Sequence, residues 1–270
     1  MTALTAAGRE RSWAARLARV GMLAPALLYV LVGWLALALA LGHEQGNPSR
    51  KGALHALESH TWGKAILVAL AAGFAGYALW RFVAAALGEK VQADDDLNVW
   101  KRLWYVARGL GYCVLCWTTV QVLLGGGGSG SDTSAQRSKT AEVLSWPAGR
   151  WLVAAAGLGV IAYGGGSIYR GVTKKFADDL KLGELDADAR RWFCRVGTFG
   201  WCARGVVLGL IGVFLVESAW SYDPKQSKGL DGALATLAAQ PFGRVLLAVV
   251  AVGLISFGLF YVVRSRYREV

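Results

Sequence analysis

The chain has 270 residues, of which 55% are hydrophobic and only 17% are charged. This composition is too apolar for the surface of a soluble protein of one or two domains. The formal net charge of +11 raises nucleic acid as a partner, so the distribution of the basic residues has to be considered.

Six apolar runs of about 20 residues follow one another along the chain, which is the length that a helix needs to cross a bilayer core of roughly 30 Å. Short alternating segments typical of membrane strands are absent from the sequence. The composition therefore predicts an all-α membrane protein with six transmembrane helices. The predicted spans are 20–41, 62–87, 103–124, 151–168, 196–219 and 241–263.

The first run has two interpretations. Arg9 to Arg19 followed by an apolar run ending in small residues resembles a signal peptide, but the run of 20–41 is longer than the usual apolar region of about 7 to 15 residues. We expect it to be retained as the first helix. Pro25 is tolerated there because neighbouring helices can satisfy the freed carbonyl.

The basic residues are unevenly distributed between the two sides of the predicted bundle. Counted with the adjoining helix ends, and with Arg108 included, the two termini and the second and fourth connections hold 19 of the 29. The first, third and fifth connections hold 9, Lys64 and Arg244 among them, and Arg204 is the remaining one. Because Lys and Arg accumulate in cytoplasmic loops, we expect both termini in the cytoplasm. The positive charge then sets the orientation of the chain in the membrane and allows contact with membrane lipids. Nucleic acid is not an expected partner.

The outer connections combine polar segments with short amphipathic stretches. The first connection carries all three histidines, but His55, Glu58 and His60 lack the spacing of a helical zinc motif, so a solvated segment is favoured over a metal site. Stretches at 52–57, 143–144 and 232–237 place leucines on one helical face, and we expect them to lie flat at the outer membrane surface. A Gly-rich linker at 125–131 precedes the middle stretch.

The inner connections contain acids followed by paired bases. Asp94 to Asp96 could hold a divalent cation, but a solvated linker that leaves Lys101 and Arg102 available to anionic head groups is favoured.

The chain repeats itself three times. A shift of 179 or 180 residues places Arg16 on Arg195 and the triplet at 52–54 on the identical triplet at 232–234; a more divergent copy lies between them. We predict three tandem helix-hairpin repeats at 16–88, 101–171 and 195–264, arranged as a pseudo-three-fold bundle.

Arg204 and Arg108 occupy equivalent places in the third and second repeats, inside predicted spans. An intramembrane arginine usually pairs, faces a cavity or extends to the interface. Both are candidate binding residues for an anion or a lipid head group. The alternative is that their long stems carry the charge to the inner interface.

Gly205 and Gly209 form a Gly-x-x-x-Gly motif, which predicts close helix packing. Cys113 and Cys116 form a Cys-x-x-Cys motif inside an apolar helix, where a role as small core residues is favoured over redox or metal chemistry. The sequence contains no Ser-His-Asp order, His-Glu-x-x-His motif or intramembrane aspartate pair. We therefore expect neither an enzyme nor a cofactor or metal site.

The recurring unit Arg-x-Gly-x-x-Ala-Arg-Gly, then Gly-Ala-Leu and Pro-x-Gly-Arg, resembles the repeat of a bacterial membrane family known as domain of unknown function 1206. The match is best at 203–205, 232–234 and 241–244 and departs in the first copy, where Pro25-Ala26 stands for Arg-Gly. The resemblance implies three two-helix units and a location in the bacterial inner membrane, and it implies no established activity.

Two functional hypotheses follow. The first is a non-enzymatic scaffold or lipid-interacting component of the inner membrane. The second is a transporter or channel for small anions that uses Arg108 and Arg204 at its centre.

Overall fold

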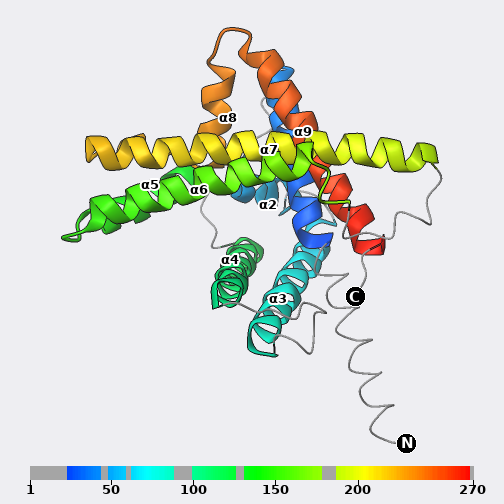
Figure 1. Cartoon of the computed structure of the whole chain (residues 1–270), viewed down its shortest axis with the longest axis horizontal. Coiled ribbons are helices and arrows are strands. Elements are labelled where there is room, and N and C mark those ends of the chain that lie inside the picture. The colour runs from blue at the N-terminus through cyan, green and yellow to red at the C-terminus, as the bar shows by residue number, and fades with distance from the viewer. Residues whose placement is uncertain are drawn as a thin grey trace, which may run out of the picture. The chain divides into compact units, whose positions relative to one another are not determined.

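A computed structural model describes residues 23–43, 48–58, 62–87, 99–125, 131–177 and 187–267. These residues are helical almost throughout and contain no strand, so the predicted all-α class is confirmed for the described part of the chain (Figure 1). The predictions concerning the basic N-terminal tail, His60, Asp94 to Asp96 and most of the Gly-rich linker lie outside the described residues.

Along the chain, a short helix lies between the two long helices of each of three successive pairs. The helices are Leu23–Ala40, α2 (Arg50–Glu58), α3 (Gly63–Leu87), α4 (Val99–Leu123), α5 (Asp132–Leu144), α6 (Gly149–Val172), α7 (Ala187–Ser221), the 3-10 helix η3 (Pro224–Gln226), α8 (Leu230–Ala238) and α9 (Gly243–Tyr267).

Six of the described helices are long and apolar enough to cross a membrane, which confirms the six predicted spans. They are Leu23–Ala40, α3, α4, α6, α7 and α9. Helix α7 differs from its prediction because it begins at Ala187 instead of Val196. Its 35 residues extend about 52 Å at about 1.5 Å per residue, which is more than a bilayer core requires.

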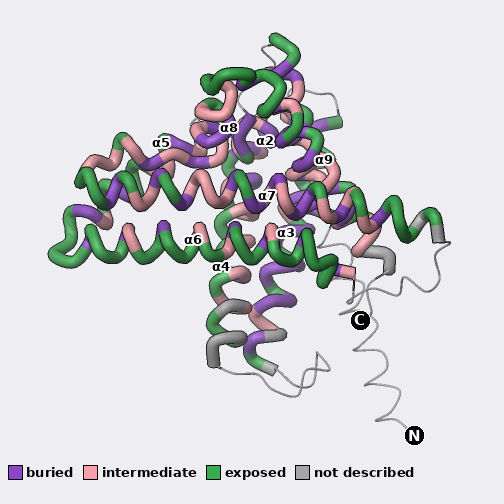
Figure 2. The backbone as a smooth tube through the Cα atoms, turned by 45° about the horizontal axis from the view of Figure 1, so that its top comes forward, coloured by how far each residue is buried: buried purple, intermediate pink, exposed green. Residues whose placement is uncertain are grey.

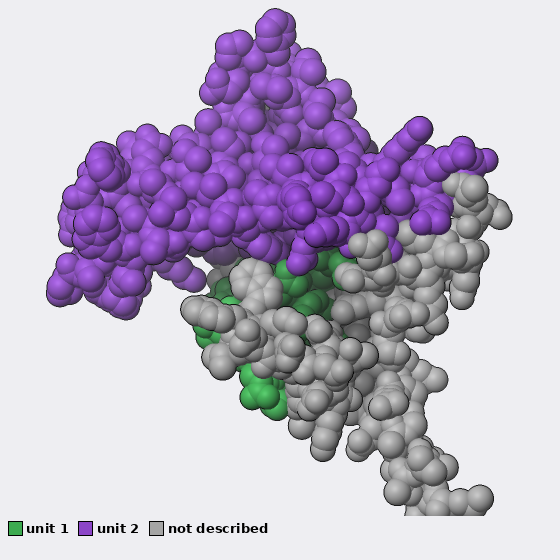
Figure 3. All heavy atoms as spheres, viewed as in Figure 1, with its two compact units in different colours: residues 1–27, 57–128, 261–270 green, residues 28–56, 129–260 purple. Residues whose placement is uncertain are grey.

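The chain forms two compact units that combine helices from different repeats (Figure 3). Unit 1 contains residues 1–27, 57–128 and 261–270, and its described centre is the α3–α4 hairpin. Unit 2 contains residues 28–56 and 129–260, and in it α6 and α7 lie side by side over most of their length (Figures 1 and 2). The hairpin repeats and their pseudo-three-fold arrangement stay predictions from the sequence.

The core of unit 2 explains the recurring Gly-Ala-Leu triplet. Ala53, Leu54, Ala233 and Leu234 are fully buried, as the purple segments of α2 and α8 illustrate (Figure 2). These side chains pack against apolar residues of the helix Leu23–Ala40, α7 and α9. The expectation that the apolar faces of the short helices lie on the membrane surface is therefore wrong for these residues, because each face is covered by the long helices.

Three short helices, α2, α5 and α8, begin at one junction in unit 2. The backbone N–H of Arg50 donates to Asp132 Oδ2 (3.0 Å), and both the N–H and the hydroxyl of Thr133 donate to Asp231 Oδ1 (2.9 and 2.8 Å). The N–H of Gly229 donates in turn to the hydroxyl of Thr133 (2.9 Å). Helix N-termini leave N–H groups unsatisfied and favour nearby negative charge, so the two carboxylates hold the three N-termini together.

A glycine begins the long helix that follows each short one, and in all three repeats it is required by close approach. An added Cβ would lie within about 2 Å of a carbonyl oxygen in the last turns of the short helix. The pairs are Gly63 with Leu57 O at 1.5 Å, Gly149 with Val143 O at 1.8 Å and Gly243 with Ala238 O at 2.0 Å. The glycine of the Pro-x-Gly-Arg motif therefore permits the tight reversal between the two helices.

Candidate functional site

Arg204 lies in the middle of α7 and binds tyrosines from two other helices of unit 2. Its Nε donates to the hydroxyl of Tyr29 (3.1 Å), and its Nη2 donates to the hydroxyl of Tyr163 on α6 (2.6 Å). The side chain is half-buried. Hydrogen bonds from a charged donor are stronger than neutral ones, so these contacts connect three helices through one cation.

Aromatic rings cover the same guanidinium. Its Cζ lies 5.0 Å from the ring centre of Tyr163, 5.0 Å from that of Phe257 and 5.7 Å from that of Trp201. A cation over an aromatic face is attracted by the ring quadrupole, and more strongly where water is excluded. We call Arg204, Tyr29, Tyr163, Trp201 and Phe257 the Arg204 clamp; it contains residues of all three sequence repeats.

Glycines of the recurring motif bring the backbones of the clamp helices together. A Cβ on Gly200 would lie 2.6 Å from the backbone of Phe257, and one on Gly205 would lie 2.7 Å from the carbonyl oxygen of Gly164. The predicted packing residue Gly209 differs, because a Cβ there would meet no atom within 4 Å, although a Cβ on Gly164 would lie 3.0 Å from the backbone nitrogen of Gly209. Close approach of α6 and α9 to α7 is what places tyrosine and phenylalanine rings on Arg204.

Arg108, the second predicted site residue, lies on α4 in unit 1, whereas Arg204 lies in unit 2. It is half-buried. Tyr105 and Tyr112 share its helical face, since they lie three residues before it and four residues after it. Tyr112 packs against Tyr77 of α3 with ring centres 4.4 Å apart, so this face of α4 points at α3.

Arg81 on α3 is a buried cation that the sequence analysis missed. Only 5% of its surface is exposed, and its Nη2 donates to the hydroxyl of Tyr77 (2.5 Å). Its Cζ lies 5.0 to 5.3 Å from the ring centres of Tyr77, Trp80 and Tyr105. The sequence does contain a signal for it, namely an arginine inside the predicted span 62–87.

The cysteines remain free thiols, and their surroundings differ. Cys116 is half-buried and its thiol donates to the carbonyl oxygen of Ala71 (3.4 Å), whereas Cys113 is exposed on α4. The core role predicted for Cys113 is therefore wrong, because its side of the helix is not covered by protein. Within the described ranges, no three His, Cys, Asp or Glu side chains are grouped as a metal site would require.

Comparison with known proteins gives one family and one uncharacterized relative. The family described as Domain of Unknown Function (DUF1206) matches three tandem segments of the chain, residues 20–88, 103–174 and 199–268. The chain is also similar to the uncharacterized protein YxxB of Bacillus subtilis (strain 168), with 27% identity over 259 residues, covering 96% of this chain and 93% of that protein. No solved structure matches the chain significantly.

Proposed function

The chain belongs to the family of domain of unknown function 1206, and we propose that this member is a non-enzymatic, lipid-interacting scaffold of the bacterial inner membrane. Its partners would be membrane lipids, and its two termini would lie in the cytoplasm. Six apolar helices fit a multi-pass membrane protein, and the similarity to a Bacillus subtilis protein supports a bacterial setting.

The Arg204 clamp carries this proposal. A transport site for anions needs a cation that the solute can reach and release. The Arg204 guanidinium instead donates to Tyr29 and Tyr163 and is covered by rings of its own helix bundle. A cation that is hydrogen-bonded and covered by the protein's own side chains stabilises helix packing. This role favours a scaffold over an anion transporter.

The proposed orientation of the chain across the membrane rests on the basic residues at one end of the long helices. Arg190, Arg191 and Arg195 lie in the first turns of α7, where the helix is longer than a bilayer core requires. Lys175 lies just after α6, at the end that adjoins the same connection. An excess of basic residues in short loops marks the cytoplasmic side, so we place this end in the cytoplasm.

The absence of enzymatic activity is part of the proposal and rests on the sequence of the spans. They contain no His-Glu-x-x-His motif and no aspartate pair that could share a proton or a metal ion. Two of the buried hydroxyls within the described spans, those of Ser167 and Thr119, donate to carbonyls of their own helices.

Two measurements on the purified full-length protein test the scaffold against the transporter. Native mass spectrometry with phosphatidylglycerol and phosphatidylcholine of identical acyl chains should show preferential retention of the anionic lipid. Reconstituted vesicles should show no chloride or phosphate flux above protein-free vesicles.

A flux that is lost in Arg204→Leu but kept in the exposed control Arg102→Leu would instead establish the transporter and overturn the scaffold. Equal retention of both lipids would overturn the lipid-interacting role.

A further inference from the structure

We infer that the α3–α4 hairpin binds the phosphate group of an anionic phospholipid through Arg81 and Arg108. This inference rests on the lipid-interacting role proposed above and names the residues that would perform it. The repeat predicts a site formed by Arg108 and Arg204. The site inferred here instead combines Arg108 with Arg81, which belongs to the same compact unit.

Arg81 has a buried donor that no side chain or backbone group of the described residues satisfies. Its Nη2 is bound by Tyr77, but its buried Nε has no hydrogen-bond partner among the described residues. A buried polar donor without a partner is costly, and a planar guanidinium presents its N–H groups in a fork that matches phosphate oxygens. An oxyanion is the chemistry that would satisfy both the donor and the charge.

Helical geometry places Arg108 on the face of α4 that packs against α3. The Arg81 guanidinium lies over Tyr105 of α4, and Tyr77 of α3 packs on Tyr112. Arg108 lies between Tyr105 and Tyr112 on one face of α4, so it belongs to the stripe that faces α3. Both arginines and three tyrosines thus line one side of the hairpin.

The charge of the hairpin is uncompensated by its own helices. Helices α3 and α4 together contain no Asp or Glu. They contain five basic residues, namely Lys64, Arg81, Lys101, Arg102 and Arg108. A cation inside an apolar span is expensive unless an anion accompanies it, and neither helix supplies one for Arg81.

Depth and surroundings favour a lipid over free phosphate. Arg81 lies six residues before the end of α3, about 9 Å at about 1.5 Å per residue, and Arg108 lies about 13 Å from the start of α4. Leu79, Leu103 and Leu110 around them are 56 to 57% exposed, and the span on α4 is only 17% buried. A phosphate bound at this depth would have an apolar surface beside it for acyl chains.

The experiment titrates short-chain phosphatidylglycerol or phosphatidylcholine into the detergent-purified full-length protein and counts bound lipid by native mass spectrometry. The variants are Arg81→Gln and Arg108→Gln. Lys64→Gln is the matched control, because it removes a positive charge from an exposed site of the same hairpin, at the start of α3. Each site variant should lose about tenfold in phosphatidylglycerol affinity, which corresponds to about 1.4 kcal/mol, and the control should stay within about twofold.

The outcomes separate this inference from the function on which it rests. If wild type prefers phosphatidylglycerol and both folded site variants bind it as tightly as Lys64→Gln does, the Arg81–Arg108 site is wrong and the lipid-interacting role stands. If wild type shows no preference, both fail. If excess inorganic phosphate displaces the lipid from wild type, the site recognises free phosphate and the lipid assignment is overturned. Arg108→Gln, at a half-buried position, keeps the test decisive if Arg81→Gln does not fold.

Discussion

Tyr163 of α6 accepts a 2.6 Å hydrogen bond from Nη2 of Arg204 of α7, and the Arg204 guanidinium also lies 5.0 Å from the centre of the Tyr163 ring. One tyrosine therefore supports an intramembrane cation through both its hydroxyl and its aromatic face. Helices α6 and α7 pack extensively against each other in unit 2. The Tyr163–Arg204 pair therefore depends on this packing, which fixes where the charge lies.

Tyr163→Phe removes the hydroxyl and keeps the ring. Hydrogen bonds to charged groups contribute about 1.5 to 3 kcal/mol, so we expect a loss of stability of about that size. The measurement is thermal or denaturant unfolding of the purified protein in detergent. Tyr169→Phe is the control, because Tyr169 is an exposed tyrosine of the same helix. Equal unfolding midpoints for the two variants would contradict the clamp.

Gly205→Ala places a methyl group against α6. The new Cβ would lie 2.5 Å from Ile168 Cγ1 and 2.7 Å from the carbonyl oxygen of Gly164, and the second contact is with backbone that cannot move aside locally. Overpacking of this kind costs about 1 to 3 kcal/mol, so we expect a lower unfolding midpoint. Gly166→Ala should have no such effect, since a Cβ at Gly166 meets nothing within 4 Å. Helix propensity alone would make both alanine variants more stable, so a similar change in both would contradict close packing at Gly205.

Thr133→Val tests the junction of the short helices. The substitution keeps the shape of the side chain but removes the hydroxyl that accepts from the N–H groups of Gly229 and Gly232 and donates to Asp231. Buried donors left without partners cost about 1 to 3 kcal/mol, so the first turn of α8 should open more often. Hydrogen exchange should become faster in residues 229–234 and remain unchanged in α3.

The matched control for the junction is Thr118→Val, because the exposed Thr118 hydroxyl bonds only to Val114 of its own helix. Faster exchange in α8 of this control as well, or unchanged exchange in Thr133→Val, would contradict the role of the junction.

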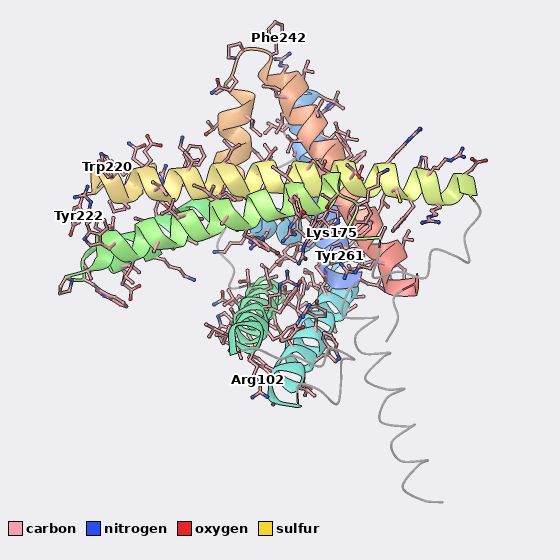
Figure 4. All side chains as sticks on the ribbon, viewed as in Figure 1. Arg102, Lys175, Trp220, Tyr222, Phe242 and Tyr261 are labelled. Carbon is pink, nitrogen blue, oxygen red and sulfur yellow. The ribbon has the colours of Figure 1, made fainter. Side chains whose placement is uncertain are left out.

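The proposed orientation predicts opposite labelling at two exposed positions. Phe242 lies at the tip of the turn between α8 and α9 and is 85% exposed, whereas Arg102 lies in the first turn of α4, at the end where the chain connects α3 to α4 (Figure 4). In a cysteine-free background, Phe242→Cys should react with a membrane-impermeant thiol reagent applied to cells whose inner membrane is intact. Arg102→Cys should react only after the membrane is opened. The reverse pattern would place the termini outside.

The sequence by itself determined the six spans, because a bilayer demands about 20 apolar residues wherever a helix crosses it and this demand is local. It also determined the family, since the glycines of the recurring motif mark backbone contacts that only glycine permits, as at Gly63, Gly149 and Gly243.

The tertiary structure alone decided what each cation contacts. Arg204 and Arg108 look equivalent in the repeat, yet one lies in a clamp of unit 2 and the other on α4 of unit 1. The partners Tyr29 and Tyr163 are 175 and 41 residues from Arg204 along the chain. No local pattern encodes such distant contacts, because they depend on which helix faces pack together, and the same packing buried the apolar faces of α2 and α8 that had been expected at the membrane surface.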